Sequence, residues 1–350
     1  MPDRRKLVEL WKRGNAAALV TLVRVEGSSY RRTGARLLIA SDGEYAGAIS
    51  GGCLEAEVIR KTQWKVRSGA CMDRYSTLFD DTADIPYGLG CGGTVDLLLE
   101  PANTPEFAAL MAAMEASLHG ELRRVSTTLP EDGRVFARTV LNACGDVLYS
   151  TASTLHDDAA YSFDEVFAPS QRLFVFGAGD DAQPLVASAA AMGWRVIVID
   201  GRAQWARRER FPEAMTVQAS LAGLCIDDAD AVAIMTHSYE QDREFLRQAL
   251  PASPRYLGLL GARHRSALLL SEAAAMLGWP IERACEDVFA PMGLDLGGDG
   301  AEAIALATVA EIQASLSGKL PRIRRMTAEV VSEQIAKGGA SRYLQTQCAL

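Results

Sequence analysis

Short apolar runs separated by turn residues dominate the first half of the chain, a pattern typical of sheet strands with few helices. Strands are expected at Ala18 to Val25, Arg36 to Ala40, Tyr45 to Ser50, Arg74 to Phe79 and Thr94 to Glu100. Apolar residues at helical spacing predict helices over Leu7 to Lys12, directly after Gly52, and over Pro105 to Leu118. Three more short strands are expected before Ser150.

From residue 171 the pattern changes to strands that alternate with helices, which favours a doubly wound parallel sheet. The expected strands are Arg172 to Phe176, Arg195 to Ile199, Met215 to Gln218, Ala231 to Met235 and Arg255 to Leu260. Residues 151–170 are polar and weakly periodic, so they are interpreted as a connector. The predicted α/β organisation is a mixed α/β domain over 1–150, the connector, a Rossmann-like domain over 171–318 and a C-terminal tail over 319–350.

Composition narrows the class of protein. The chain has 350 residues, of which 49% are hydrophobic and 23% charged, as in ordinary globular proteins of about two domains. A net charge of −8 lacks the basic character of nucleic-acid binders. No apolar run is long enough for a membrane span, and no signal peptide is expected at the N-terminus. Seven cysteines, an odd number, indicate free thiols in a reducing cytoplasm.

The segment Gly177-Ala178-Gly179 follows an apolar strand and opens a helix. With Asp200 located 23 positions after Gly177, it matches the dinucleotide-binding fingerprint in its required strand–turn–helix setting. Gly177 would permit the tight turn, Gly179 would let the backbone approach a pyrophosphate, and Asp200 could bind a ribose hydroxyl. Rossmann folds also serve as scaffolds, so the use of NAD(P) stays open.

Charged residues near this turn leave further alternatives. Asp180 and Asp181 would repel a phosphate, and their other interpretation is capping of the helix N-terminus. Arg202 could accept a 2′-phosphate, whereas Asp200 favours a free hydroxyl, so NAD and NADP are not distinguished. Arg202 could equally be an exposed arginine.

Two more residues follow predicted strands of the second domain. His237 comes after the fourth strand, where such folds bind ligands. It could act as a general acid–base or occupy a turn. Arg263 follows the Gly261-Ala262 turn and could hold a phosphate, or it could be a solvated arginine at a helix start.

Two cysteines lie in glycine-rich settings. Cys53 follows Gly51 and Gly52 at a predicted helix N-terminus, which would favour a thiolate. Cys91 lies within Gly90-Cys91-Gly92-Gly93, whose amides could face an anion. Each could instead be a small buried hydrophobe. That second interpretation is preferred for Cys71, Cys144, Cys225 and Cys285. The cysteine spacing fits no zinc motif, so no structural metal is expected.

Several motifs occur together in a fixed order. They are Gly27-Ser28-Ser29-Tyr30-Arg31-Arg32, Gly47 to Glu55, Gly90 to Gly93, the Gly177–Gly179 turn, Tyr256 to Arg263, Ala290 to Gly297 and Ala310-Glu311-Ile312. This order resembles the XdhC/CoxI family of accessory factors for xanthine dehydrogenase and related molybdenum hydroxylases. The resemblance extends over about residues 7 to 318.

The resemblance implies a cytoplasmic chaperone, and not a turnover enzyme, that binds the molybdenum cofactor in its mono- or dinucleotide form. It implies protection of the cofactor during sulfuration and insertion into an apo-hydroxylase of the xanthine dehydrogenase type. The implied partners are that hydroxylase and a cysteine desulfurase. A homo-oligomer such as a dimer is also expected, although the resemblance leaves a single chain open, and charge and hydropathy predict no nucleic-acid or membrane partner.

Cys53 and Cys91 would then lie near molybdenum or its sulfur, since soft thiolates suit such a centre. Amides of Gly51, Gly52, Gly90 and Gly92 would contact the pterin phosphate. Two alternatives remain. One is an NAD(P)-dependent oxidoreductase, because of Gly177, Gly179 and Asp200, and the other is a protein-interaction scaffold.

Overall fold

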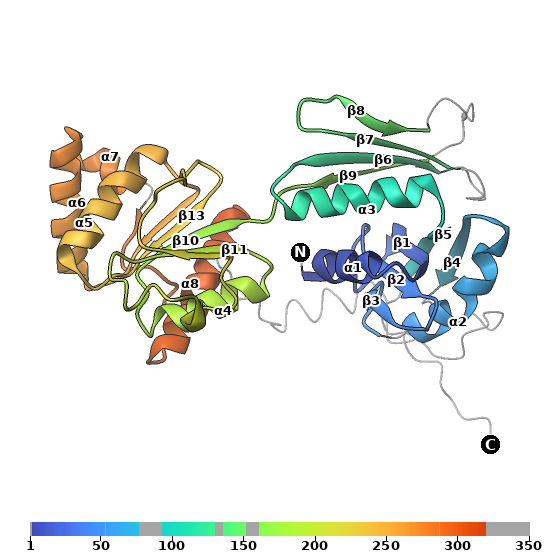
Figure 1. Ribbon diagram of the computed structural model, residues 1–350, viewed down its shortest axis with the longest axis horizontal. Helices are drawn as coiled ribbons and strands as arrows, with labels where there is room; N and C mark the ends of the chain where they lie inside the picture. Colours follow the sequence, from blue (N-terminus) through green and yellow to red (C-terminus); the bar gives the residue numbers. More distant parts are fainter. Residues whose placement is uncertain are drawn as a thin grey trace, which may run out of the picture. The chain divides into compact units, whose positions relative to one another are not determined.

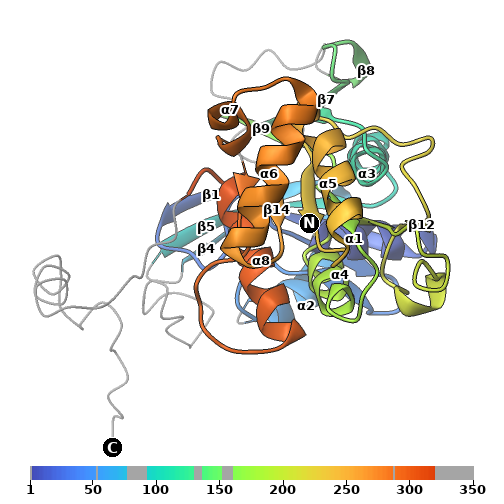
Figure 2. The ribbon, with the colours of Figure 1, turned by 90° about the vertical axis from the view of Figure 1, so that its left-hand side faces the viewer.

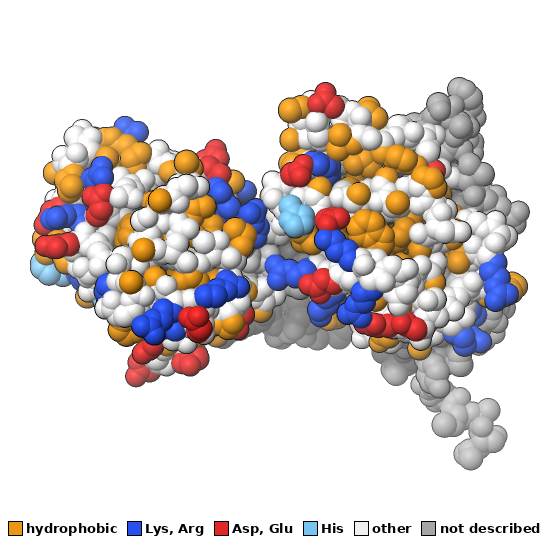
Figure 3. Space-filling view, viewed as in Figure 1, with side chains coloured by type: hydrophobic (Ala, Val, Ile, Leu, Met, Phe, Trp, Pro, Cys, Tyr) orange, Lys and Arg blue, Asp and Glu red, His pale blue; other side chains and the backbone are white. Residues whose placement is uncertain are grey.

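The computed structural model describes residues 2–52, 54–76, 93–129, 136–151, 161–286 and 288–319. These residues form two compact units, one that ends at Pro169 and one that begins at Ser170 (Figure 1). None of the helices that the structure describes has both the length and the apolar sequence needed to cross a lipid bilayer. On the face shown in Figure 3, basic and acidic side chains are interspersed on both units.

The first unit contains a five-stranded antiparallel sheet in the order β3-β2-β1-β5-β4. Its strands are β1 (Ala16–Gly27), β2 (Arg36–Ala40), β3 (Tyr45–Gly47), β4 (Cys71–Ser76) and β5 (Gly93–Pro101). The predicted strands are present in the described residues. Strand β4 begins at Cys71, three residues before its predicted start, and its predicted end at Thr77 to Phe79 lies outside the described residues. However, β3 ends at Gly47 and not at Ser50, so the glycine-rich segment that follows is a loop.

Helices cover both faces of this sheet. One face packs against α1 (Pro2–Lys12) and α3 (Pro105–Leu118) through residues such as Leu19 and Leu38. The other face packs against α2 (Glu55–Lys65) through residues such as Val20. Helix α3 has the predicted bounds, because Thr104 caps its N-terminus by accepting a bond from the Phe107 amide at 3.2 Å.

A second antiparallel sheet, in the order β8-β7-β6-β9, packs against α3 as well. Its strands are β6 (Arg123–Leu129), β7 (Ala137–Leu141), β8 (Val147–Ser150) and β9 (Tyr161–Phe167). The prediction that 151–170 is a connector is therefore wrong for 161–167, which pairs along its whole length with β6. The strand was missed because Glu165 stands at an inward position between Phe163 and Phe167, where it pairs with the buried Arg36.

The second unit is a six-stranded parallel sheet in the order β12-β11-β10-β13-β14-β15. Its strands are β10 (Arg172–Phe176), β11 (Arg195–Ile199), β12 (Thr216–Gln218), β13 (Ala231–Ile234), β14 (Tyr256–Leu259) and β15 (Val288–Phe289). This is the strand order of dinucleotide-binding Rossmann folds, so the predicted fold class is confirmed. Strand β15 was not predicted, because two residues are too few to carry a periodic pattern.

Paired helices cover the two faces of the parallel sheet (Figures 1 and 2). Helices α4 (Ala182–Ala191) and α8 (Ala301–Leu316) pack on one face. Helices α5 (Tyr239–Ala249) and α6 (Arg263–Leu277) pack on the other, followed by the short α7 (Ile281–Cys285). The carboxyl ends of the strands thus carry the loops that bind ligands in such folds.

The interpretation of four cysteines as small buried residues is wrong for three of them. Cys144, Cys225 and Cys285 are exposed, and only Cys71 is half-buried, where it packs against the core beneath α2. Each exposed cysteine lies in or beside a loop or a short helix, outside the regular apolar patterns that identify core positions.

Candidate functional site

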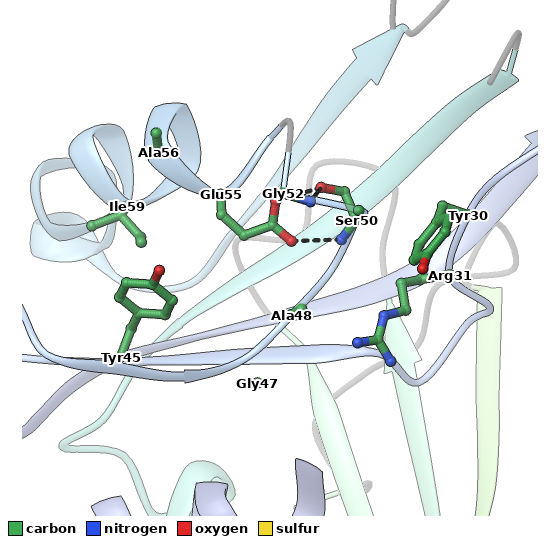
Figure 4. Close-up of a pocket in the computed structure, with 11 residues that line it drawn as sticks. Tyr30, Arg31, Tyr45, Gly47, Ala48, Ser50, Gly52, Glu55, Ala56 and Ile59 are labelled. Carbon is green, nitrogen blue, oxygen red and sulfur yellow. Dashed lines mark hydrogen bonds between the residues drawn. The ribbon is translucent and has the colours of Figure 1, made fainter. Parts of the chain in front are cut away.

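A hollow of about 620 Å³ opens in the first unit between the end of β3 and the start of α2 (Figure 4). Its volume is typical of small-molecule sites, which range over about 300–1,000 Å³. Gly51 and Gly52, both predicted site residues, line it. Tyr30 and Arg31 line it too, so the structure brings two motifs from separate parts of the sequence to one place.

The loop beside the hollow is held by Glu55, the first residue of α2. The Glu55 carboxylate accepts hydrogen bonds from the amides of Ile49, at 3.1 Å, and Ser50, at 2.8 Å. It also accepts a short bond from the Ser50 hydroxyl. The Ser50 Oγ in turn accepts bonds from the amides of Gly52, at 3.1 Å, and Leu54, at 3.2 Å. This Ser50–Glu55 clamp satisfies amides that would otherwise be unpaired at the start of the helix.

The clamp depends on an ionised carboxylate. Burial of Glu55 raises its pKa, but the hydrogen bonds from the Ser50 hydroxyl and from the amides outweigh burial, so the net pKa of Glu55 is lowered. Glu55 therefore stays negatively charged at neutral pH. Gly52 has a φ of +107°, a backbone conformation that L side chains rarely adopt, so the clamped loop also requires a glycine there.

Aromatic and cationic side chains surround the hollow. Tyr30 is 71% exposed, and its ring lies against Gly51, where an added Cβ would be 3.5 Å from Tyr30 Cγ. Arg31 donates to Asp3 of α1 at 3.0 Å. Tyr45 of β3 and Ile59 of α2 lie on the other side (Figure 4). The hollow thus has an apolar side and a side that carries a cation.

The start of β5 reaches the same region. Gly93 pairs with Gly27, and an added Cβ at Gly93 would be only 2.2 Å from the Ser28 carbonyl oxygen. The Gly90–Gly93 motif therefore ends against the turn that precedes Tyr30. Cys53, Gly90, Cys91 and Gly92 lie outside the described residues, so their predicted roles remain predictions.

In the second unit, Gly177 needs to be a glycine. Its φ is +121°, and an added Cβ would lie 2.4 Å from the Met235 carbonyl oxygen. At Gly179 an added Cβ would instead lie 2.6 Å from Asp181 Oδ1. The Asp181 carboxylate therefore lies over the second glycine of the turn, where the backbone would approach a pyrophosphate.

Asp200 is fully buried at the carboxyl end of β11. It accepts bonds from the Ala178 amide at 2.8 Å and from Arg202 through its amide at 2.9 Å, its Nε at 2.9 Å and its Nη2 at 2.7 Å. A carboxylate offers about four lone-pair positions, so a ribose hydroxyl would have to displace Arg202. Burial raises the Asp200 pKa, but the bonds from Arg202 and the Ala178 amide outweigh it, and the net pKa is lowered.

Arg202 is also not a free surface arginine, because it donates to the Thr236 carbonyl at 3.1 Å.

The expected alternative for Asp180 and Asp181, capping of α4, is wrong. The N-cap residue Asp181 makes no side-chain cap bond. Asp180 accepts from Arg210 at 2.7 Å, and Asp181 lies 2.7 Å from His237 Nε2.

The structure places the two remaining predicted residues at the same sheet edge. His237 is exposed, has a left-handed φ of 60° and lies three residues after the end of β13. Arg263 is exposed at the first position of α6. Arg265, which sequence reasoning missed, instead pairs with the buried Asp242 at 2.7 Å. In the sequence, its place two residues after Arg263 at the helix start was the signal that could have identified it.

Within the described residues no group of three His, Cys, Asp or Glu side chains could hold a metal ion. The described part of the hollow has an aromatic rim and one guanidinium, which suit an organic anion better than a bare cation. The Gly52 amide, predicted to contact a phosphate, instead donates to Ser50 Oγ.

Two family models match the chain. One, described as the XdhC and CoxI family, matches residues 10–76, and another, described as the XdhC Rossmann domain, matches residues 173–312. A protein of Bacillus subtilis (strain 168), named as a probable subunit of xanthine dehydrogenase, is 29% identical over 313 residues, which are 85% of this chain and 92% of that protein.

A second relative, from Escherichia coli (strain K12), is named "Molybdenum cofactor insertion chaperone PaoD". It is 28% identical over 308 residues, which are 88% of this chain and 86% of that protein. A crystal structure described as a xanthine dehydrogenase from Bacillus halodurans matches with a TM-score of 0.77 and 27% identity, over 95% of this chain and 99% of that one.

Proposed function

Because the chain belongs to the XdhC and CoxI family, we propose that it is an accessory factor that binds the molybdenum cofactor and inserts it into a hydroxylase of the xanthine dehydrogenase type. Relatives named as a molybdenum cofactor insertion chaperone and as a probable part of xanthine dehydrogenase support this assignment. Both align over most of their length, so the likeness is not restricted to one of the two units.

The observation that carries the proposal is the hollow beside the Ser50–Glu55 clamp. Two motifs from distant parts of the sequence line it, Tyr30-Arg31 and the Gly47–Glu55 loop. The start of β5 at Gly93 lies against Ser28, in the turn that precedes Tyr30. The clamp fixes the amides of Gly52 and Leu54, the neighbours of Cys53. The described residues on either side of Cys53 are thus hydrogen-bonded in place.

On this proposal Cys53 and Cys91 face the metal end of the cofactor. Thiolates are soft ligands, and they suit a molybdenum centre whose terminal ligand is exchanged for sulfur. Cys53 follows Gly52 directly, and Cys91 precedes Gly93 by two residues, so each thiol is close in sequence to a residue of the site. Protection during sulfuration, with a cysteine desulfurase as partner in the cytoplasm, is the finer part of the proposal.

An NAD(P)-dependent oxidoreductase is the alternative, and the geometry of the second unit favours it less. Asp200 is saturated by Ala178 and Arg202, and the Asp181 carboxylate lies over Gly179. A pyrophosphate at this turn would meet two carboxylates at the N-terminus of α4, and like charges repel it. In the conformation described, the Rossmann unit is therefore better suited to a scaffold role.

Transfer of cofactor to an apo-hydroxylase tests the proposal. The full chain, loaded with molybdenum cofactor and freed of excess by gel filtration, is added to an apo-enzyme of the xanthine dehydrogenase type. We expect hydroxylase activity to appear in proportion to the loaded chain, faster than with the same amount of free cofactor. Activation no better than with free cofactor would contradict an insertion role, and oxidation of NADPH by the chain would favour the alternative.

A further inference from the structure

Helix α2 has an inner face that packs on the sheet and an outer face that does not. The inner face includes Val58, which is fully buried. The outer face carries Arg60 and Trp64 and, in the 3-10 turn Val66–Ser68 that follows, Arg67. We infer that this outer face is a docking surface for an acidic patch on the protein that receives the cofactor. The inference rests on the proposed function.

Trp64 is the first observation that supports a docking surface. Its side chain is 68% exposed, although tryptophan is buried over most of its surface in most proteins. Two other partly exposed tryptophans are each covered by an arginine. The guanidinium of Arg210 lies 4.4 Å from the ring centroid of Trp205, and Arg283 lies 3.8 Å from that of Trp279. Within the described residues Trp64 has no such cover, so its ring is available to a partner.

The charge on the outer face of α2 is positive. Residues 56–68 contain four lysines and arginines but a single acid, Glu57, in a chain whose net charge is −8. Arg60 and Lys61 share the Glu57 carboxylate, at 2.9 and 2.5 Å, and basic side chains lie over α2 in Figure 3. Arg67 is exposed and forms no ion pair with any described residue. Opposite charge on a partner would therefore be complementary to this face.

The outer face of α2 is also next to the hollow. Ala56 and Ile59 of the same helix line the hollow, and Arg60 follows Ile59 directly in the chain. A protein that docks on the outer face would therefore stand beside the opening through which the cofactor leaves. Holding donor and acceptor together in this way raises the effective concentration of the cofactor at the acceptor.

A protein fits this surface better than a membrane or a nucleic acid. A helix that binds a bilayer surface inserts an apolar face, but the apolar face of α2, at Val58, is packed against the sheet. Nucleic-acid binding depends on many cations that neutralise phosphates, which a chain of net charge −8 does not favour. Tryptophan and arginine together, as in Trp64 and Arg67, are the residue types that contribute most at protein interfaces.

Association of the cofactor-loaded full chain with the apo-hydroxylase of the transfer assay, measured by biolayer interferometry, tests the inference. We expect Trp64→Ala to weaken association about tenfold or more, as at other interface tryptophans. Arg67→Glu should weaken it by a similar factor, because it places a carboxylate against an acidic patch. Association should also weaken with added salt, and less so for Arg67→Glu. Neither residue lines the hollow, so both variants should retain the molybdenum cofactor like the unmodified chain.

Matched controls are Leu306→Ala on α8, where the side chain is 63% exposed, and Arg124→Glu, at an exposed position of β6. Both should associate with the apo-hydroxylase like the unmodified chain. Unchanged affinity in either Trp64→Ala or Arg67→Glu would overturn the inference. Binding of the chain to vesicles of equal parts phosphatidylserine and phosphatidylcholine, abolished by Trp64→Ala, would overturn it too, because the surface would then belong to a membrane.

Transfer of cofactor at limiting apo-hydroxylase separates this inference from the proposed function. If the unmodified chain activates the hydroxylase and Trp64→Ala activates it at the same rate, the inference fails and the proposed function stands. If the unmodified chain neither associates with the hydroxylase nor activates it, the proposed function fails, and the inference fails with it.

Discussion

Removal of the charge from Glu55 is the most informative single perturbation of the clamp. Glu55→Gln keeps the shape of the side chain, and its amide oxygen can still accept from the amides of Ile49 and Ser50, which both bind Oε1. The bonds lose their charge, however, and the Ser50 hydroxyl loses its acceptor at Oε2. Bonds to a charged group contribute about 1.5–3 kcal/mol, against about 0.5–1.5 kcal/mol for neutral ones.

From this difference we expect Glu55→Gln to lower the free energy of unfolding of the first unit by about 1–3 kcal/mol. The matched control is Glu57→Gln on the same helix. Among the described residues Glu57 forms ion pairs with Arg60 and Lys61 on its own helix, so removal of its charge should lower the free energy of unfolding by only about 0.5 kcal/mol.

The assay is urea denaturation followed by hydrogen exchange of peptides from β1 and β2, which reports on the first unit separately. Peptides over residues 48–56 should also lose protection in Glu55→Gln, because the clamped amides lie there. A Glu55→Gln chain as stable and as protected as the Glu57→Gln chain would refute the view that the carboxylate holds this loop.

Three further predictions concern stability. The pKa of Glu55 is lowered from 4.5 in the folded chain, so its contribution to the free energy of unfolding is complete above pH 4.5 and is lost as the pH falls further. The free energy of unfolding should therefore decrease more steeply with falling pH in the unmodified chain than in Glu55→Gln. Gly52→Ala should lower the free energy of unfolding by about 1–3 kcal/mol, because an alanine is strained at the positive φ of this position. Gly51→Ala, whose added Cβ would make an ordinary contact with Tyr30, should change it by about 0.5 kcal/mol or less, as thermal unfolding can measure. Glu165→Gln should lower the free energy of unfolding by about 3 kcal/mol, because it leaves the buried Arg36 charge unpaired. The same denaturant midpoint for this variant and the unmodified chain would show that 161–167 does not hold the unit together.

The parallel sheet was predictable because its strands are continuous apolar runs bounded by turns. Phe174 and Val175 face opposite cores, so both positions must be apolar, and the pattern reveals the strand directly. Strand β9 shows the opposite case. Its inward position at Glu165 is charged, and only the distant Arg36 makes that burial favourable. No local pattern contains that partner.

The candidate site was predictable where a local sequence pattern marks it and not where it depends on contacts between distant segments. Glycines at Gly51 and Gly52 indicated an accessible loop, and the structure places both at the hollow. The approach of Tyr30 to Gly51 depends on the path of the chain between β1 and β2, which the sequence does not reveal. The expectation that Asp200 is available to a ribose failed to anticipate Arg202, whose guanidinium reaches back two residues and occupies the carboxylate.

Metal analysis of the chain after incubation with molybdenum cofactor and gel filtration tests most directly whether the protein carries this cofactor through its two glycine-flanked thiols. The unmodified chain should retain molybdenum in stoichiometric amounts. A control with Cys144→Ser and Cys225→Ser, two exposed cysteines away from the glycine motifs, should retain the same amount. The Cys53→Ser, Cys91→Ser double variant should fold normally and lose most of it. Stoichiometric retention by that double variant, or no retention by the unmodified chain, would contradict the proposed function of these residues.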